Sequence, residues 1–152
     1  MAPDVVVSTS IARPPSVVWD AVADAARLVQ HSPEAHHVSG AAPGPLPVGA
    51  TFSGSNRRGV FRWTTRCRVV ESTPGEAFAF EVTYLGLAVA LWRYVLTPDT
   101  TGTRVEEQWT DRRGVLMKAL GTVGTGVADR RAHNESTMRA TLESLRSSLE
   151  VA

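Results

Sequence analysis

Hydrophobic and polar positions follow two different periods along the chain. Between residues 35 and 111, apolar and polar side chains alternate in short runs that are separated by Gly, Pro, Asn and Asp, which is typical of strands joined by turns. The same alternation marks the start of the chain. We therefore expect strands at residues 4–11, 35–41, 50–56, 60–72, 76–84, 87–97 and 103–111.

A helical segment follows the first predicted strand. Pro14 and Pro15 end that strand and suit the first turn of a helix, where a backbone N–H has no partner. An apolar stripe then recurs at helical spacing, and we expect a bend at residues 24–26 to divide the segment into two short helices. The stripe consists of Val18, Trp19, Val22 and Val29.

A long amphipathic helix is predicted near the other end, at about residues 127–149. At 100° per residue, the face that carries its leucines extends back toward the start of the helix. This face consists of Val127, Arg131, Asn134, Met138, Leu142, Leu145 and Leu149.

The order of these elements predicts an α+β fold in which a strongly curved antiparallel sheet wraps around the last helix. The two short helices follow the first strand of that sheet. One helix about 10 Å wide cannot fill a wide, curved sheet, so we expect a cavity between them. The alternation makes one sheet face apolar and aromatic and the other charged, and the apolar face is expected to point toward the cavity.

Five stretches of the sequence carry a resemblance to a known family. They are STSIARPPSVVWDAVAD, VGATFSGSNRRG, FRWTTRCRVVESTPGEAFAFEV, WRYVLTPDTTGTRVEEQW and ADRRAHNESTMRATLESLRSSLE. With this order of elements, the chain resembles the START-like (SRPBCC, helix-grip) superfamily, and within it the polyketide cyclase/dehydrase-like proteins. The resemblance implies a helix-grip fold with an internal apolar cavity closed by the last helix. It implies no single catalytic motif, because the superfamily includes ring cyclases, dehydratases and carriers of hormones and lipids.

Composition narrows the setting. The chain has 152 residues, of which 43% are hydrophobic and 20% charged, so we expect a single domain over residues 1–152 with a packed core. The net charge of +1 argues against a nucleic-acid partner. No apolar run approaches the ~20 residues of a membrane span, and no signal peptide is recognisable. The single Cys67 fits a reducing compartment, and abundant Arg with Lys118 as the lone Lys suggests a bacterial, cytoplasmic protein.

Glu107 is the most informative single residue. Its alternation with Val105 and Trp109 points it toward the concave face of the sheet, where a lone carboxylate is unfavourable by several kcal/mol unless it is paired. The phase of the last helix predicts Arg131 as its partner. A Glu107–Arg131 contact is open to two interpretations, a structural ion pair or a general acid or base with a shifted pKa.

Aromatic side chains gather on the same predicted face. Plain core packing accounts for some of them. Small residues between the rings leave room for a planar, mostly apolar guest whose oxygens meet Tyr hydroxyl and Trp N–H groups. The expected ligand-binding residues are Trp63, Thr65, Phe80, Trp92, Trp109, Arg131, Asn134 and Met138, and the expected catalytic residues are Glu107, Tyr84 and Tyr94.

Other chemistry-bearing residues give weaker hypotheses. The histidines do not have the spacing of a metal site. His36 and His37 are adjacent and therefore face opposite ways in a strand, and His133 is expected on the outer side of its helix. His31 is the fourth histidine. Cys67 is expected to behave as a small hydrophobe. A Gly-rich stretch at 121–126 is expected to form a lid or hinge before the last helix.

The sequence therefore supports two functions, and its small size also permits a third, that of an accessory or toxin-like partner protein. One is an enzyme that cyclises and dehydrates a polyketide-like molecule by acid–base chemistry, without metal or redox cofactor. The other is a non-catalytic carrier or sensor of a hydrophobic ligand such as a lipid. In both cases the expected partner is a small hydrophobic molecule. An acyl carrier protein is a further candidate partner, and its anionic group would bind Arg57 and Arg58. The protein is expected to be a monomer or a homodimer.

Overall fold

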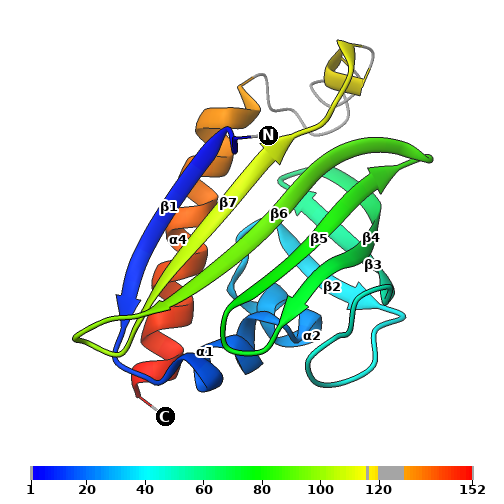
Figure 1. The fold of residues 1–152 in the computed structure, drawn as a ribbon. Coiled ribbons are helices and arrows are strands. Elements are labelled where there is room, and N and C mark those ends of the chain that lie inside the picture. Colours follow the sequence, from blue (N-terminus) through cyan, green and yellow to red (C-terminus); the bar gives the residue numbers. More distant parts are fainter. Residues whose placement is uncertain (1, 116, 120–128, 152) are drawn as a thin grey trace.

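The computed structural model describes residues 2–115, 117–119 and 129–151 (Figure 1). Strand β1 (Val5–Ile11) is followed by two short helices, α1 (Pro15–Val22) and α2 (Ala25–Leu28), and a single 3-10 turn (Val29–His31). The remaining strands are β2 (Ala35–Ser39), β3 (Thr51–Arg58), β4 (Phe61–Thr73), β5 (Ala77–Tyr84), β6 (Leu87–Pro98) and β7 (Thr103–Asp111), and helix α4 (Arg130–Glu150) follows them.

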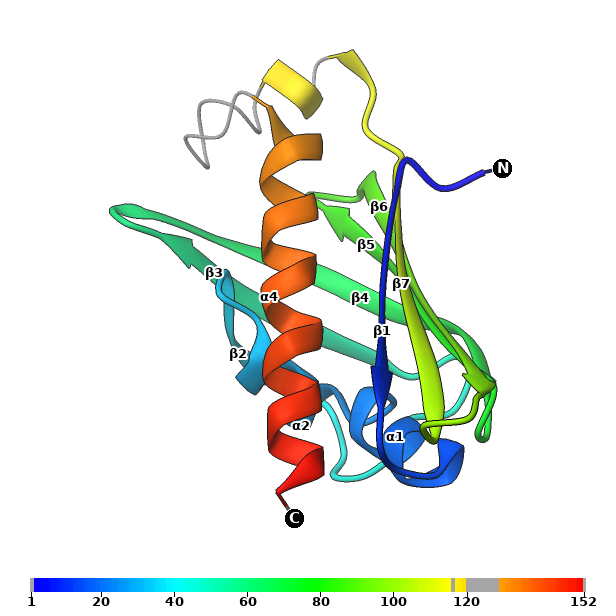
Figure 2. The same cartoon turned by 90° about the vertical axis from the view of Figure 1, so that its left-hand side faces the viewer.

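The described strands form one antiparallel sheet in the order β1-β7-β6-β5-β4-β3-β2. From β2 to β7 each strand pairs with the next one along the chain, and β1 pairs with β7 at the edge opposite β2. The sheet curves, and α4 runs along its hollow side (Figure 2). The predicted α+β helix-grip fold is therefore confirmed, and every predicted strand is present with its ends displaced by two residues or fewer.

The break between the two short helices depends on Asp24. Its side chain caps α2, because Oδ1 accepts hydrogen bonds from the backbone N–H groups of Ala26 and Arg27 at 3.1 and 3.3 Å. Its other oxygen, Oδ2, accepts from the N–H of Gly44 at 3.1 Å. The buried carboxylate thus confirms the bend predicted at residues 24–26 and ties the loop after β2 to the helices.

Helix α1, the β1–α1 junction and the β6–β7 turn pack closely together at one end of the curved sheet, which we call the sealed end. The indole N–H of Trp19 on α1 donates to the carbonyl of Ala77 at 3.0 Å. At the β6–β7 turn, a Cβ placed on Gly102 would lie 2.6 Å from the carbonyl oxygen of Ile11 and 2.7 Å from the nitrogen of Arg13, so only glycine fits there. The Thr103 hydroxyl donates to the Arg13 carbonyl at 2.7 Å, which fixes this turn against the β1–α1 junction.

Helix α4 begins at Arg130, three residues after the predicted start. The Asp129 side chain caps it by accepting from the Ala132 N–H at 3.1 Å. Near its other end, Glu150 accepts from the N–H of Ala12 at 2.9 Å, which anchors the helix beside the sealed end. Its buried face consists of Asn134, Met138, Thr141, Leu142, Leu145 and Leu149. Val127 lies outside the described residues.

Candidate functional site

A cavity of about 470 Å³ lies between the concave face of the sheet and α4. This volume falls within the range of sites for small organic ligands. Alternate residues of each strand line it, because successive side chains of a strand point to opposite faces. The sheet contributes Trp63, Thr65 and Cys67 from β4, Phe78, Phe80, Val82 and Tyr84 from β5, Trp92 and Tyr94 from β6, and Glu107 and Trp109 from β7; α4 contributes Arg130, Asn134, Thr137, Met138 and Thr141.

The structure brings the predicted site residues together with one exception. Every predicted catalytic or ligand-binding residue lines this cavity except Arg131. Their roles in binding or catalysis stay predictions.

Glu107 is paired with a tyrosine. The Tyr94 hydroxyl donates to Glu107 Oε1 at 2.8 Å, and the two residues lie directly opposite each other on β6 and β7. The other carboxyl oxygen, Oε2, is buried and has no hydrogen-bond partner among the described residues. The side chain is only 2% exposed, and this burial raises the pKa of Glu107 to about 8, although the hydrogen bond from Tyr94 lowers it.

Burial also acts on the neighbouring acids of the cavity. The pKa of Tyr94 is raised well above its ordinary value, first by burial and then by the Glu107 carboxyl. Burial raises the pKa of the Cys67 thiol to about 11, so this residue is a neutral part of the wall, as expected of a small hydrophobe. Tyr84 is half-buried and faces the same cavity.

The predicted Glu107–Arg131 contact is wrong. Arg131 is exposed, and its neighbour Arg130 lines the cavity instead. The reason is helical phase: Arg130 lies four residues before Asn134 and so deviates by 40° from it, whereas Arg131 deviates by 60° on the other side. Arg130 forms an ion pair with Glu34.

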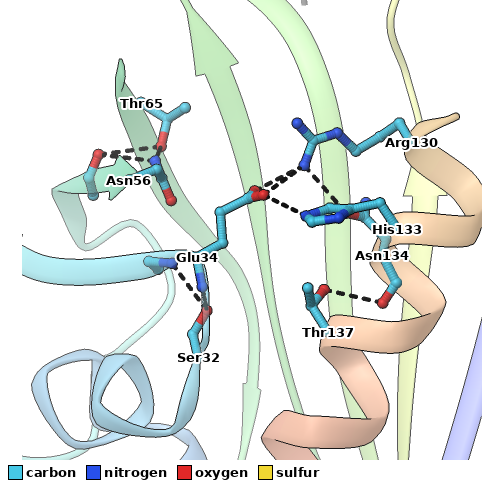
Figure 3. Close-up of polar contacts among 10 residues, drawn as sticks. Ser32, Glu34, Asn56, Thr65, Arg130, His133, Asn134 and Thr137 are labelled. Carbon is cyan, nitrogen blue, oxygen red and sulfur yellow. Dashed lines mark hydrogen bonds and ion pairs between the residues drawn. The ribbon is translucent and has the colours of Figure 1, made fainter. Parts of the chain in front are cut away.

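A cluster of four polar residues, which we call the mouth cluster, joins α4 to the segment before β2 (Figure 3). Glu34 accepts from Arg130 Nη1 at 2.8 Å and contacts His133 Nε2 at 2.7 Å. Asn134 Oδ1 accepts from the same Arg130 nitrogen at 3.4 Å. The guanidinium also lies 5.7 Å from the centre of the Trp63 ring, a cation–π distance. Burial lowers the pKa of Arg130, while the charge of Glu34 raises it.

His133 therefore differs from its predicted position on the outer side of the helix. It is partly buried because it faces Glu34 across the mouth. His36 and His37 are exposed on β2, and His31 contacts the Ser144 hydroxyl at 2.8 Å. Within the described ranges, no group of three His, Cys, Asp or Glu residues is placed to hold a metal ion.

A second cleft, of about 500 Å³, adjoins the mouth. It lies between the β3–β4 turn and α4, and it shares Glu34, Arg62 and Thr137 with the cavity. Arg57 and Arg58 line it, so both predicted anion-binding arginines lie beside the mouth. The predicted lid at 121–126 lies outside the described residues; before it, Met117 lines the cavity and Val115 is 88% exposed.

Glu34 and Arg130 are the charged residues of the mouth cluster that the sequence did not reveal. They lie 96 positions apart, and no periodicity links a residue before a strand to the first turn of a distant helix. The Asp129 cap was the available signal: an Asp at the N-cap would have placed Arg130 in the first turn.

Replacing Glu34 by Gln is expected to weaken the mouth cluster. The variant removes the charge that compensates the partly buried Arg130, so the free energy of unfolding should fall by about 1–3 kcal/mol, and amides in the first turn of α4 should exchange faster. Glu135→Gln is the matched control, because its ion pair with Arg139 is 3.9 Å long and exposed. Equal exchange rates at α4 in the two variants would contradict this role of Glu34.

Comparison with known proteins identifies the family of this chain. Residues 2–150 match the model of the family described as polyketide cyclase / dehydrase and lipid transport. The chain belongs to this family. No sequence among the curated proteins matches it. Within the described residues, no helix is long and apolar enough to cross a membrane.

Solved structures share the fold of this family member at low sequence identity. The polyketide cyclase-like protein Cgl2372 from Corynebacterium glutamicum is 24% identical, with a TM-score of 0.63 and coverage of 97% of this chain and 91% of that one. The Aha1 dimer from Colwellia psychrerythraea is 15% identical, with a TM-score of 0.68 and coverage of 97% and 96%. The di-domain ARO/CYC protein StfQ from the steffimycin biosynthetic pathway is 16% identical, with a TM-score of 0.69; the match covers 95% of this chain and 51% of that one.

Proposed function

We propose that the cavity binds a small, largely apolar molecule of aromatic or polyketide-like character and catalyses its cyclisation with loss of water. The observation that carries the proposal is the cavity itself: about 470 Å³, lined by aromatic rings, with one buried carboxyl at its wall. Three Trp side chains and Tyr84 face the space, and flat rings favour stacking with a planar guest. The polyketide cyclase/dehydrase family and the StfQ neighbour support this choice of substrate class.

In this proposal Glu107 moves the protons. With a pKa of about 8 it is mostly a neutral acid at pH 7. To eliminate water from a β-hydroxy ketone, Glu107 gives its proton to the leaving hydroxyl as the C–O bond breaks. The carboxylate then takes a proton from the adjacent carbon, whose C–H electron pair forms the new C=C bond. The Tyr94 hydroxyl stabilises the transient carboxylate by its hydrogen bond, and Tyr84 is placed to orient a substrate oxygen.

A non-catalytic carrier of a hydrophobic ligand, such as a lipid, is the second candidate. The observation that favours it is the sparse acid–base equipment of the cavity. Of the two carboxyls in the described lining, Glu34 is bound to Arg130 and His133, which leaves Glu107 alone for chemistry. The family description includes lipid transport as well as cyclases.

The proposal also covers the compartment, the cofactors, the oligomeric state and the protein partner. We treat residues 1–152 as one domain of a bacterial cytoplasmic protein that works without metal or redox cofactor, as a monomer or homodimer. An acyl carrier protein is the candidate macromolecular partner, and Arg57 and Arg58 beside the mouth support it because arginines suit an anionic tether. The dimeric Aha1 neighbour supports testing for a homodimer.

Two variants test the enzyme directly. Trp63→Ala should weaken binding of aromatic ligands by about tenfold or more, because it removes a cavity wall and the ring beneath Arg130. Thr64→Ala, on the opposite face of the same strand, should not. Glu107→Gln should bind the same ligands yet lose about 10²–10⁴-fold in turnover of a β-hydroxy ketone substrate. Turnover that survives in Glu107→Gln would leave the carrier function, and equal binding by the Trp63 and Thr64 variants would remove the cavity site.

A further inference from the structure

We propose that Glu107 also determines ligand specificity, by donating a hydrogen bond from Oε2 to an acceptor oxygen on the part of the ligand that lies against the β6–β7 wall. This oxygen is the leaving hydroxyl in a substrate and a ketone in a ligand that does not react. This inference rests on the proposed function, since it needs a ligand in the cavity. It assigns the chemical feature that the cavity selects, which neither the fold nor the family match supplies.

The two carboxyl oxygens of Glu107 have different surroundings. Oε1 accepts the Tyr94 hydroxyl at 2.8 Å. Oε2 has no partner among the described residues, although it is fully buried. A buried polar atom without a partner is rare in proteins and calls for an explanation, of which a missing ligand is one.

Among the described residues, no cation lowers the pKa of Glu107. Besides Arg130, the cavity lining contains Arg62 and Arg113, and Asp111 binds Arg113 at 2.9 Å. On β1 its neighbour in register is Val7, and on β6 it is Tyr94. The α4 residues that face the cavity opposite it are neutral, and the hydroxyl of Thr141 is turned to the carbonyl of Thr137. Arg130, the cation of α4 in the cavity lining, is held at the mouth by Glu34. Neutral Glu107 is therefore the stable form at pH 7, in agreement with its raised pKa.

The proton of neutral Glu107 belongs on Oε2, because Oε1 is already accepting. Once a guest has displaced water from the cavity, a donor that faces no acceptor in the protein is satisfied by an acceptor on the guest. A methylene group at that place has no acceptor atom and leaves the donor unsatisfied. An amine is a donor itself and would need the ionised Glu107 carboxylate as its acceptor. The cavity should thus prefer a ketone over its methylene analogue, and this preference should vanish as Glu107 ionises above pH 8.

The test uses 9-fluorenone and fluorene, two planar probes that differ by a C=O in place of a CH₂. Dissociation constants are measured by fluorescence titration from pH 6 to pH 9.5 for the parent protein, Glu107→Gln and Glu107→Leu, after equal folding has been verified by denaturant unfolding. In the parent, fluorenone should bind about tenfold more tightly than fluorene at pH 6, and the ratio should fall toward one at pH 9.5. Fluorenone binding at pH 9 should also take up protons, which calorimetry in two buffers detects.

The two variants separate donation from other roles of the carboxyl. In Glu107→Gln, an amide N–H can donate at every pH, so the ketone preference should persist without pH dependence or proton uptake. In Glu107→Leu the preference should disappear. A parent ratio that is the same at pH 6 and pH 9.5, or a preference that survives in Glu107→Leu, would overturn this inference alone. Failure of the parent to bind either probe would overturn the proposed ligand site together with it.

Discussion

Glu107→Gln should flatten the pH dependence of stability between about pH 4.5 and pH 8. The folded pKa of about 8 lies above the ordinary value of 4.5 that applies to the unfolded chain. Between these values the folded protein holds one more proton than the unfolded chain, so the free energy of unfolding falls as the pH rises. The loss amounts to about 1.4 kcal/mol per pH unit, or on the order of 5 kcal/mol over the whole window. Gln does not titrate and should show no such term.

Denaturant unfolding at pH 5, 6, 7, 8 and 9 measures this difference. The free energy of unfolding of Glu107→Gln minus that of the parent should increase steadily from pH 5 to pH 8 and then level off. Glu106→Gln is the matched control, because Glu106 is the neighbouring residue on β7 and its ion pair with Arg104 is partly exposed. Parallel curves for Glu107→Gln and the parent would show that the carboxyl is not held neutral, and the acid role proposed for it would fail.

Thr65→Trp is expected to weaken ligand binding strongly while leaving the fold intact. Thr65 lies on the cavity face of β4, between Trp63 and Cys67. Its hydroxyl contacts the Gly54 carbonyl and the Asn56 amide at 3.5 Å and the Cys67 thiol, a weak hydrogen-bonding group, so little is lost when it is replaced. An indole at this position would occupy space that a ligand needs. Affinity for aromatic ligands should fall by about a hundredfold, and the free energy of unfolding by no more than about 2 kcal/mol.

The control for this variant is Thr64→Trp, which places the same indole on the exposed face of β4. Titration of both variants with the same aromatic ligands, together with denaturant unfolding of each, separates blocking of the cavity from damage to the sheet. Unchanged affinity in a folded Thr65→Trp would mean that the ligand binds elsewhere.

The strands and their inward faces could be predicted because they depend on local periodicity. A period of two assigns each side chain to a face whatever the partner strand, which is why Glu107, Tyr94 and the Trp residues were placed in the cavity correctly. The Tyr94–Glu107 pair itself was not predicted. It follows from the register between β6 and β7, in which the two residues lie opposite each other, and the sequence pattern does not fix that register.

The contacts of the mouth cluster could not be predicted from the sequence. Helical phase predicts a face, but two adjacent arginines at about 40° and 60° from Asn134 both lie near the edge of that face, and the phase alone does not decide between them. Arg131 was chosen because it lies three residues before Asn134, near the face that carries the leucines, but Arg130, four residues before Asn134, is the arginine that lines the cavity. Glu34 had no local pattern at all, since its partners lie on a distant element. Contacts of this kind depend on tertiary packing.

The central claim is that the cavity takes up an aromatic or polyketide-like ligand, and thermal unfolding tests it most directly. The parent protein and Thr65→Trp are each heated with a panel of polyphenolic and polyketide-like aromatics and with a panel of fatty-acyl and sterol-like lipids. A ligand at ~100 times its dissociation constant should stabilise the parent by about 2.7 kcal/mol. The account predicts a rise in the parent's midpoint with members of the aromatic panel and no rise in Thr65→Trp. An unchanged unfolding midpoint of the parent with every aromatic compound, or an equal rise of the midpoint in both proteins, would contradict it.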